Sequence, residues 1–198
     1  MRFNPEIHHR QSTRLQGFDY ATAGAYFVTI CANKREQLFG NILNTVMVLN
    51  ETGKIVQRVW NELQQHYPDI ECDEFIIMPN HVHMIVCIRN SIDVGAGFPR
   101  PNENKPNENG CVLSESGISS DLGGETPPLQ IALGRIIAWM KYRSTVLINR
   151  IREMPGIPIW QRNYYERVIR DENELSRIQK YIIDNPRNWD VDPDRIAS

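Results

Sequence analysis

Two β-rich segments, 70–78 and 81–88, are separated only by Pro79 and Asn80. Proline lacks a backbone N–H and asparagine accommodates turn conformations, so this dipeptide breaks the first strand and favours a tight turn. A connection this short can join two strands only as antiparallel neighbours. The sequence therefore predicts an antiparallel hairpin at the centre of the fold.

Two histidines, His81 and His83, open the second strand of this hairpin. Side chains alternate across a strand, so the two imidazoles share one face, with backbones about 7 Å apart. Two imidazoles placed in this way can converge on one metal ion. Val82 and Met84 would then be buried on the opposite face. The alternative is that both histidines merely occupy a half-exposed strand, and their spacing alone does not decide between the two.

Other segments show strand or helix periodicity. Residues 26–31 are β-branched and aromatic and predict a buried strand, and a turn at Gly40-Asn41 should lead to a second apolar run at 45–49. Asn50 should cap a helix that ends at Tyr67-Pro68. The expected buried stripe of that helix is Ile55, Val56, Val59, Trp60 and Leu63.

The second half of the chain predicts two more helices. The first spans 129–151, and a strand or extended segment follows at 160–169. Asp171 should cap the last helix, which runs to about Asp184 and stops before Pro186. The stripe expected in the first of these helices is Ile131, Ile136, Ile137, Met140 and Leu147.

The order of these elements is β, β, α, β, β, α, β, α. It predicts an α+β fold of the ferredoxin-like (RRM-like) sandwich kind, with an antiparallel sheet covered by helices on one face and a C-terminal helix that carries the chemistry.

Residues 91–128 interrupt this pattern. They are rich in Gly, Asn, Ser and Pro and carry six acidic and two basic side chains, although the whole chain has a net charge of only −2. We predict a flexible insertion here, because the segment is too long for an ordinary connection. The expected organisation is an arm at 1–20, a single domain at 21–190 that contains this insertion, and a tail at 191–198. Without the insertion, the remainder is mildly basic.

The sequence also indicates the cellular compartment of the protein. Residues 1–10 lack the apolar core of a signal peptide, and no apolar run approaches the roughly 18 residues that a membrane span needs. The four cysteines form no C-x-x-C pair. We therefore expect a cytoplasmic protein with no membrane partner.

Tyr181 and Asn185 are four residues apart, so they should share one face near the end of the last predicted helix. A tyrosine oxygen can act as a nucleophile when a metal or a base activates it, since its ordinary pKa is about 10. The alternative is an ordinary core tyrosine, because apolar residues surround Tyr181 in the sequence.

Segment 159–167 interleaves aromatic residues with Arg162 and Arg167, and Arg170 follows closely. Rings that stack on bases and guanidinium groups that hold phosphates suit single-stranded nucleic acid. An aromatic inner face with a solvated charged outer face is the alternative. The further candidates for phosphate contact are Arg10, Arg14, Lys34 and Arg35.

Taken together and in this order, these segments resemble the single-tyrosine HUH transposases of the IS200-like family, and most closely the REP-associated tyrosine transposases. The match covers roughly residues 10–190 apart from the insertion. His81-Val82-His83 fits the histidine–hydrophobe–histidine motif, within the more specific stretch 73–83. The other matching stretches are 24–29, 38–40, 159–165 and 181–186.

The resemblance implies a ferredoxin-like protein whose tyrosine attacks a DNA phosphate and forms a covalent 5′-phosphotyrosine with the help of Mg²⁺ or Mn²⁺. By position, Tyr181 would be the nucleophile, His81 and His83 metal ligands, and Asn185 the third ligand, where related transposases often have glutamine. The implied partner is single-stranded DNA with REP-like hairpins. Single-tyrosine transposases typically act as homodimers, but the sequence leaves the choice between a monomer and a homodimer open for this chain.

Two other functions are compatible with the same residues. One is a ferredoxin-like module that binds nucleic acid without cutting it, and the other is a metal-dependent phosphodiesterase that uses water as nucleophile. Because imidazole ligands are softer than the oxygen ligands that Mg²⁺ prefers, a site of this kind should favour Mn²⁺.

Overall fold

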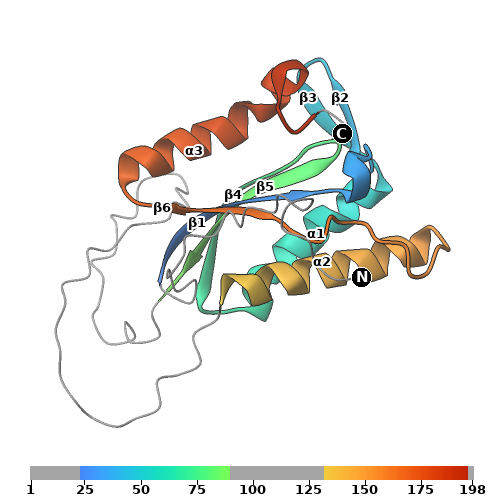
Figure 1. Ribbon diagram of the computed structural model, residues 1–198, viewed down its shortest axis with the longest axis horizontal. Coiled ribbons are helices and arrows are strands. Elements are labelled where there is room, and N and C mark those ends of the chain that lie inside the picture. The colour runs from blue at the N-terminus through green and yellow to red at the C-terminus, as the bar shows by residue number, and fades with distance from the viewer. Residues whose placement is uncertain (1–22, 90–131, 196–198) are drawn as a thin grey trace, which may run out of the picture.

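Four strands form one antiparallel sheet with the order β4-β5-β1-β6 (Figure 1). A computed structural model describes residues 23–89 and 132–195. The strands are β1 (Gly24–Cys31), β4 (Ile70–Ile77), β5 (His81–Ile88) and β6 (Tyr165–Ile169). With the helices α1 (Glu51–His66) and α2 (Leu133–Ile151) between them, this is the βαββαβ succession of the ferredoxin-like sandwich. The predicted α+β fold is confirmed.

The helices lie on both sides of this sheet. Helices α1 and α2 pack side by side on one face, and α3 (Glu172–Asp184) lies across the opposite face (Figure 1). The two faces therefore have different partners, and α3 lies over the face that carries the predicted histidines.

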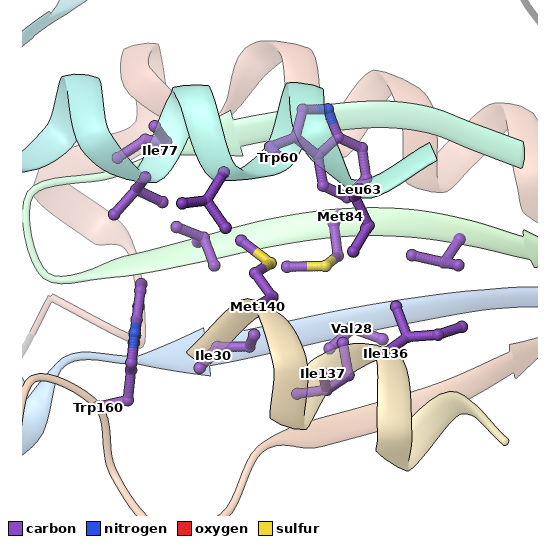
Figure 2. Packing of buried hydrophobic residues seen from close by; sticks show 14 of the residues in the cluster. Val28, Ile30, Trp60, Leu63, Ile77, Met84, Ile136, Ile137, Met140 and Trp160 are labelled. Carbon is purple, nitrogen blue, oxygen red and sulfur yellow. The ribbon is translucent and has the colours of Figure 1, made fainter. Parts of the chain in front are cut away.

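The main hydrophobic core lies between the sheet and helices α1 and α2 (Figure 2). Alternate residues of each central strand reach it, among them Val28 and Ile30 of β1 and Met84 of β5. The helices contribute, among others, Trp60 and Met140, which are both buried. The side chains predicted for the stripe of α1 are all buried, namely Ile55, Val56, Val59, Trp60 and Leu63.

A second, smaller apolar cluster lies between the sheet and α3. Phe27 of β1, Ile85 of β5 and Ile169 of β6 meet Leu175 and Ile182 of α3 there. These strand residues alternate with those of the main core, as the pleat requires. This cluster fixes α3 against the sheet.

The predicted hairpin is present, since β4 and β5 pair as antiparallel neighbours and the backbone N–H of Met78 donates to the carbonyl of His81 at 2.8 Å. Strand β4 carries a register shift between Cys72 and Phe75, whereas β5 pairs with β1 without interruption from end to end. The irregular strand is thus at the edge of the sheet, and the regular strand carries the histidines.

The predicted helix caps are also confirmed. The side chain of Asn50 accepts from the N–H of Gly53 at 3.0 Å, and α1 ends at His66. The carboxylate of Asp171 accepts from the N–H of Glu174 at 2.8 Å at the start of α3. Each cap satisfies a backbone donor that has no partner within its helix.

The prediction for residues 40–49 was wrong in one respect. Gly40 and Asn41 lie within a strand, β2 (Gly40–Leu43), and the turn falls at Asn44 and Thr45, which both have positive φ angles. Two successive positive φ angles are the geometry of a tight hairpin turn, and asparagine favours it at the first position. Strand β3 (Val46–Leu49) therefore pairs with β2 in a separate two-stranded sheet.

Two other predictions are refined by the structure. Of the segment 160–169, predicted as a strand or an extended segment, Tyr165–Ile169 is a strand, and Trp160 forms an isolated bridge with Ala32. In α2, Leu147 is only partly buried, while Ser144 and Ile148 join the buried face. Ile136, Ile137 and Met140 are buried as predicted.

Several predictions concern residues outside the described ranges: the arm at 1–20 with Arg10 and Arg14, the insertion at 91–128, and Ile131. Within the described ranges, none of the helices is long and apolar enough to cross a membrane.

Candidate active site

His81 and His83 lie on the sheet face that α3 covers, and both are almost completely buried. Their Nε2 atoms are 3.0 Å apart. Val82 and Met84 point to the opposite face and join the main core, as predicted from the alternation of β5. The strand thus directs two imidazole nitrogens toward one point.

Each imidazole is held by a second partner at its other nitrogen. Nδ1 of His83 lies 2.8 Å from Oγ1 of Thr29, the residue paired with it on β1. Nδ1 of His81 lies 2.7 Å from Oδ1 of Asn80. Because Asn80 uses its amide N–H to donate to the carbonyl of Asp194, its oxygen must accept from Nδ1–H of His81. The lone pair of His81 is therefore on Nε2, where a metal would need it.

Asp192 contributes a third ligand atom. The carboxylate and the two imidazoles form a buried group whose ligand atoms all lie within 4.8 Å of one another. Oδ2 of Asp192 is 3.8 Å from Nε2 of His81 and has no hydrogen-bond partner within the described ranges. A buried carboxylate oxygen without a partner is costly unless a cation satisfies it. This group could therefore hold a divalent metal ion.

Tyr181 and Asn185 lie one helical turn apart at the C-terminal end of α3 and face this group. The hydroxyl of Tyr181 is 3.3 Å from Nε2 of His83, and the side chain is 41% exposed, so a substrate can reach it. Asn185 is buried, and its Oδ1 also has no hydrogen-bond partner among the described residues. The structure therefore brings together the predicted tyrosine, both histidines and the asparagine.

The surroundings of His81, His83 and Tyr181 favour neutral imidazoles and a neutral phenol. Burial, helped by the positive charge of Arg35, lowers the pKa of His81 to about 3. Burial also lowers the pKa of His83 well below its ordinary value. Burial and the negative charges of Asp192 and Asp194 raise the pKa of Tyr181 to about 12. Neutral imidazoles are competent metal ligands, and a neutral phenol needs a nearby positive charge before it ionises.

The predicted DNA-contacting residues that fall within the described ranges are spread over several elements. Arg35 is near the site but pairs with the carboxylate of Asp194 at 2.6 Å. Lys34 and Arg162 are exposed. Arg167 forms an ion pair with Glu174, and Arg170 follows the end of β6 away from the histidines. The structure does not gather these cations around the metal group.

A cavity of about 430 Å³ opens beside Tyr181. Residues of β1 and of the segment that leads into β6 line it, together with His83 and Asp194. The lining includes four aromatic rings, those of Phe27, Tyr164, Tyr165 and Tyr181. Space for a substrate therefore adjoins the candidate nucleophile.

Sequence reasoning missed Asp192, Asp194, Thr29 and Asn80 as site residues. Asp192 follows the 3-10 helix Asn185–Val191, in which Trp189 is buried with its ring 6.1 Å from that of His81. A tryptophan in an otherwise polar chain end is a signal that this segment packs against the domain. The alternation within β1 places Thr29 opposite His83, but only a known strand pairing could reveal it.

A comparison with known proteins found a related sequence for this chain. No family model matches it. A protein of Haemophilus influenzae, described as uncharacterized, is 34% identical over 191 residues, which cover 96% of each chain. The chain belongs to the same family as this protein.

Among solved structures, a REP-associated tyrosine transposase bound to a REP hairpin is similar over 90% of this chain and 74% of its own, with a TM-score of 0.50 and 16% identity. The chain has the fold of that transposase, as the sequence motifs predicted. A candidate transposase from Deinococcus radiodurans is similar over 86% of this chain and 95% of its own, but its TM-score of 0.43 and 14% identity are too low to add to this.

Proposed function

We propose that this chain is a metal-dependent tyrosine transposase that cuts and rejoins single-stranded DNA. One observation carries the proposal: the hydroxyl of Tyr181 lies 3.3 Å from Nε2 of His83, which belongs to a buried group able to hold a divalent cation. A solvent-accessible phenol beside such a group is what nucleophilic attack on a phosphate requires. The transposase fold and the matching motifs support the same assignment.

In the proposed reaction, the phenolic oxygen of Tyr181 bonds to the phosphorus of a DNA phosphate. The bond from that phosphorus to the 3′ oxygen of the preceding nucleotide breaks. The proton lost by the phenol ends on the departing oxygen, so the products are a 5′-phosphotyrosine and a 3′-hydroxyl. Attack by a 3′-hydroxyl on the phosphotyrosine reverses the exchange and joins strands. No nucleotide cofactor is needed, because each step replaces one phosphate ester with another.

Two imidazoles and one or two oxygens would hold the metal. Nε2 of His81 and of His83 would bind together with the carboxylate of Asp192, and the amide oxygen of Asn185 is the further candidate. A bound Mg²⁺ or Mn²⁺ would polarise a phosphate oxygen and stabilise the charge that develops on it. The mixture of nitrogen and oxygen donors favours Mn²⁺. A metal titration of cleavage in which Mg²⁺ is clearly superior would refute this preference.

The proposed substrate is single-stranded DNA that carries a REP-like hairpin, since the structurally similar transposase is bound to one. Lys34 and Arg162 are exposed and could contact phosphates. The homodimer implied by the family resemblance stays a prediction, which sedimentation of the purified chain would check.

A denaturing gel with end-labelled hairpin DNA tests the proposal. The wild-type chain with Mn²⁺ should give a covalent protein–DNA adduct that survives denaturant, and Tyr181→Phe should give none. His81→Ala should lose cleavage and largely keep hairpin binding. Cleavage without an adduct would instead identify a phosphodiesterase that uses water, and binding without any cleavage would identify a binding module.

A further inference from the structure

We propose that the cavity beside Tyr181 binds the base of a nucleotide adjacent to the cleaved phosphate. That this nucleotide lies next to the cleaved phosphate rests on the proposed function, whereas the binding of a base rests on the cavity alone. Its volume of about 430 Å³ is near the lower end of the roughly 300–1,000 Å³ typical of small-molecule pockets. One nucleotide is an occupant of suitable size.

Aromatic residues that contact one another are part of the lining of this cavity. The ring of Phe27 has Tyr165 at 6.3 Å and Tyr181 at 6.1 Å between centroids, both in edge contact. Phe27 is buried, but Tyr165 is 43% exposed although it lies on a sheet strand. Its ring therefore offers a surface on which a base can stack, and aromatic residues on the sheet of a ferredoxin-like fold are a recurring platform for unpaired bases.

Gln161 and Asn163, on the segment that leads into β6, also line the cavity, and both carry a side-chain amide. A carboxamide carries both donors and an acceptor, as the edge of a base does, so the two groups can pair in a complementary way. The combination of a stacking ring and carboxamides suits a heteroaromatic base better than an aliphatic group.

The charges in the cavity argue against a second phosphate as the occupant. Among the described residues that line the cavity, Arg35 is the only Arg or Lys, and its guanidinium group already pairs with the carboxylate of Asp194 at 2.6 Å. A phosphate would have to compete with this carboxylate for the guanidinium group and would be repelled by it. A neutral base is not repelled by this carboxylate and does not compete with it for the guanidinium group.

The segment that carries the amides is held in place before any ligand binds. The N–H of Gln161 donates to the carbonyl of Cys31 at 2.9 Å. The ammonium group of Lys141 on α2 donates to the carbonyls of Gln161 and Arg162 at 2.6 and 3.0 Å. Trp160 anchors the start of the segment, since its indole N–H donates to Oγ of Ser144 at 2.9 Å. A site fixed in this way loses little conformational entropy on binding.

Photo-crosslinking tests the cavity independently of cleavage. The probe is a short random-sequence single-stranded DNA that contains 4-thiothymidine, and the crosslinked peptides are identified by mass spectrometry. We expect crosslinks at Tyr164 or Tyr165, and binding of the same DNA roughly tenfold weaker for Tyr165→Ala, because stacking on an aromatic ring is lost. Tyr142→Ala is the matched control, since this tyrosine is 72% exposed on α2 at the other face of the sheet, and its binding should be unchanged.

The variant Asn163→Ala provides a second measurement and should also weaken binding. Thermal unfolding of both variants checks that they remain folded. Crosslinks confined to other peptides, together with wild-type affinity for Tyr165→Ala and Asn163→Ala, would overturn the base-binding cavity.

The two proposals can fail separately. If the wild-type chain forms no adduct but crosslinks at Tyr165, the base-binding cavity stands and the transposase function fails. If the adduct forms and depends on Tyr181 while Tyr165→Ala neither weakens binding nor slows adduct formation, the function stands and the cavity proposal fails.

Discussion

The two faces of the sheet are built from alternate residues of the same strands, yet they bury different kinds of side chain. Toward α1 and α2, strand β5 presents Val82 and Met84 to a wholly apolar cluster. Toward α3, the same strand presents His81 and His83 to buried polar groups, and apolar packing is limited to a smaller cluster. The first face can be optimised for packing, and the second is free to carry chemistry.

The polar face is less favourable for folding. The Oδ1 of Asn185 and Oδ2 of Asp192 are buried without hydrogen-bond partners among the described residues. An unsatisfied buried polar group typically costs about 1–3 kcal/mol. Packing on the apolar face has to offset this cost. Substitutions on the apolar face should therefore lower stability, and substitutions on the polar face should mainly lower activity.

The largest expected effect is on activity, from Tyr181→Phe on the polar face. Loss of the proposed nucleophile should reduce adduct formation by at least roughly 10³-fold, as for other covalent catalysts. Because the side chain is 41% exposed, the free energy of unfolding should change by less than about 1 kcal/mol. A denaturing gel and a urea titration measure the two quantities, with Tyr142→Phe as control. A large loss of stability would show that the two faces are not separable in this way.

The opposite signature is expected from Met140→Ala on the apolar face. Met140 is fully buried in the main core, and truncation there should destabilise the fold by about 2–5 kcal/mol through lost contacts and a cavity. Calorimetric unfolding measures the change, with exposed Tyr142→Ala on the same helix as control. Below the unfolding temperature, metal affinity should be unchanged, and a large fall in affinity would contradict the separation of the two faces.

A smaller and more selective effect is expected from Asp192→Asn. The affinity for Mn²⁺ should fall by at least roughly tenfold, because a proposed charged ligand becomes neutral. Without metal, the variant should be as stable as the wild type or more stable, since a buried unpaired charge is removed. Melting temperatures with and without Mn²⁺ measure both effects. Asp190→Asn is the control, because its side chain is 88% exposed.

The smallest expected effect concerns Cys31, which lies on the polar face and is among the residues that line the cavity. Burial, and then the negative charge of Asp194, raises its pKa to about 11. Since only the thiolate reacts, alkylation should be slow at pH 8 and should accelerate as the pH rises toward that value. Asp194→Asn removes one negative charge and should shift this profile to lower pH. Mass spectrometry of the Cys31 peptide follows the rate, and Cys72, whose pKa burial raises to about 12, is the internal reference. An unmoved profile would contradict the assigned charge effect.

Local signals in the sequence were sufficient for most of the fold. Pro79-Asn80 predicted the central hairpin, and Asn50 and Asp171 predicted two helix starts, because turns and caps depend on residues that are close in sequence. The turn at Asn44 and Thr45 was missed, since threonine rarely adopts a positive φ and gives no turn signal there. The pairing of β2 with β3 outside the main sheet could not be inferred for the same reason.

The site was predictable in part. His81 and His83 could be predicted to share a face because side chains alternate along a strand, and Tyr181 and Asn185 because they are one helical turn apart. Asp192 lies beyond the last α-helix, where no period relates it to the histidines, and only the packing of Trp189 brings it to them. Candidate ligands that follow an irregular segment are brought to a site by tertiary packing, so their spacing in the sequence does not reveal them.

The unbroken pairing of β5 with β1 has a consequence for how this family can vary. A residue inserted into β5 would exchange the two faces beyond that point, so that imidazoles would enter the apolar layer and valine and methionine would replace them beside Tyr181. Folding and activity would be lost in a single event. Insertions and deletions among homologous sequences should therefore be absent from β5 and be tolerated in the edge strand β4, which already accommodates an irregular register.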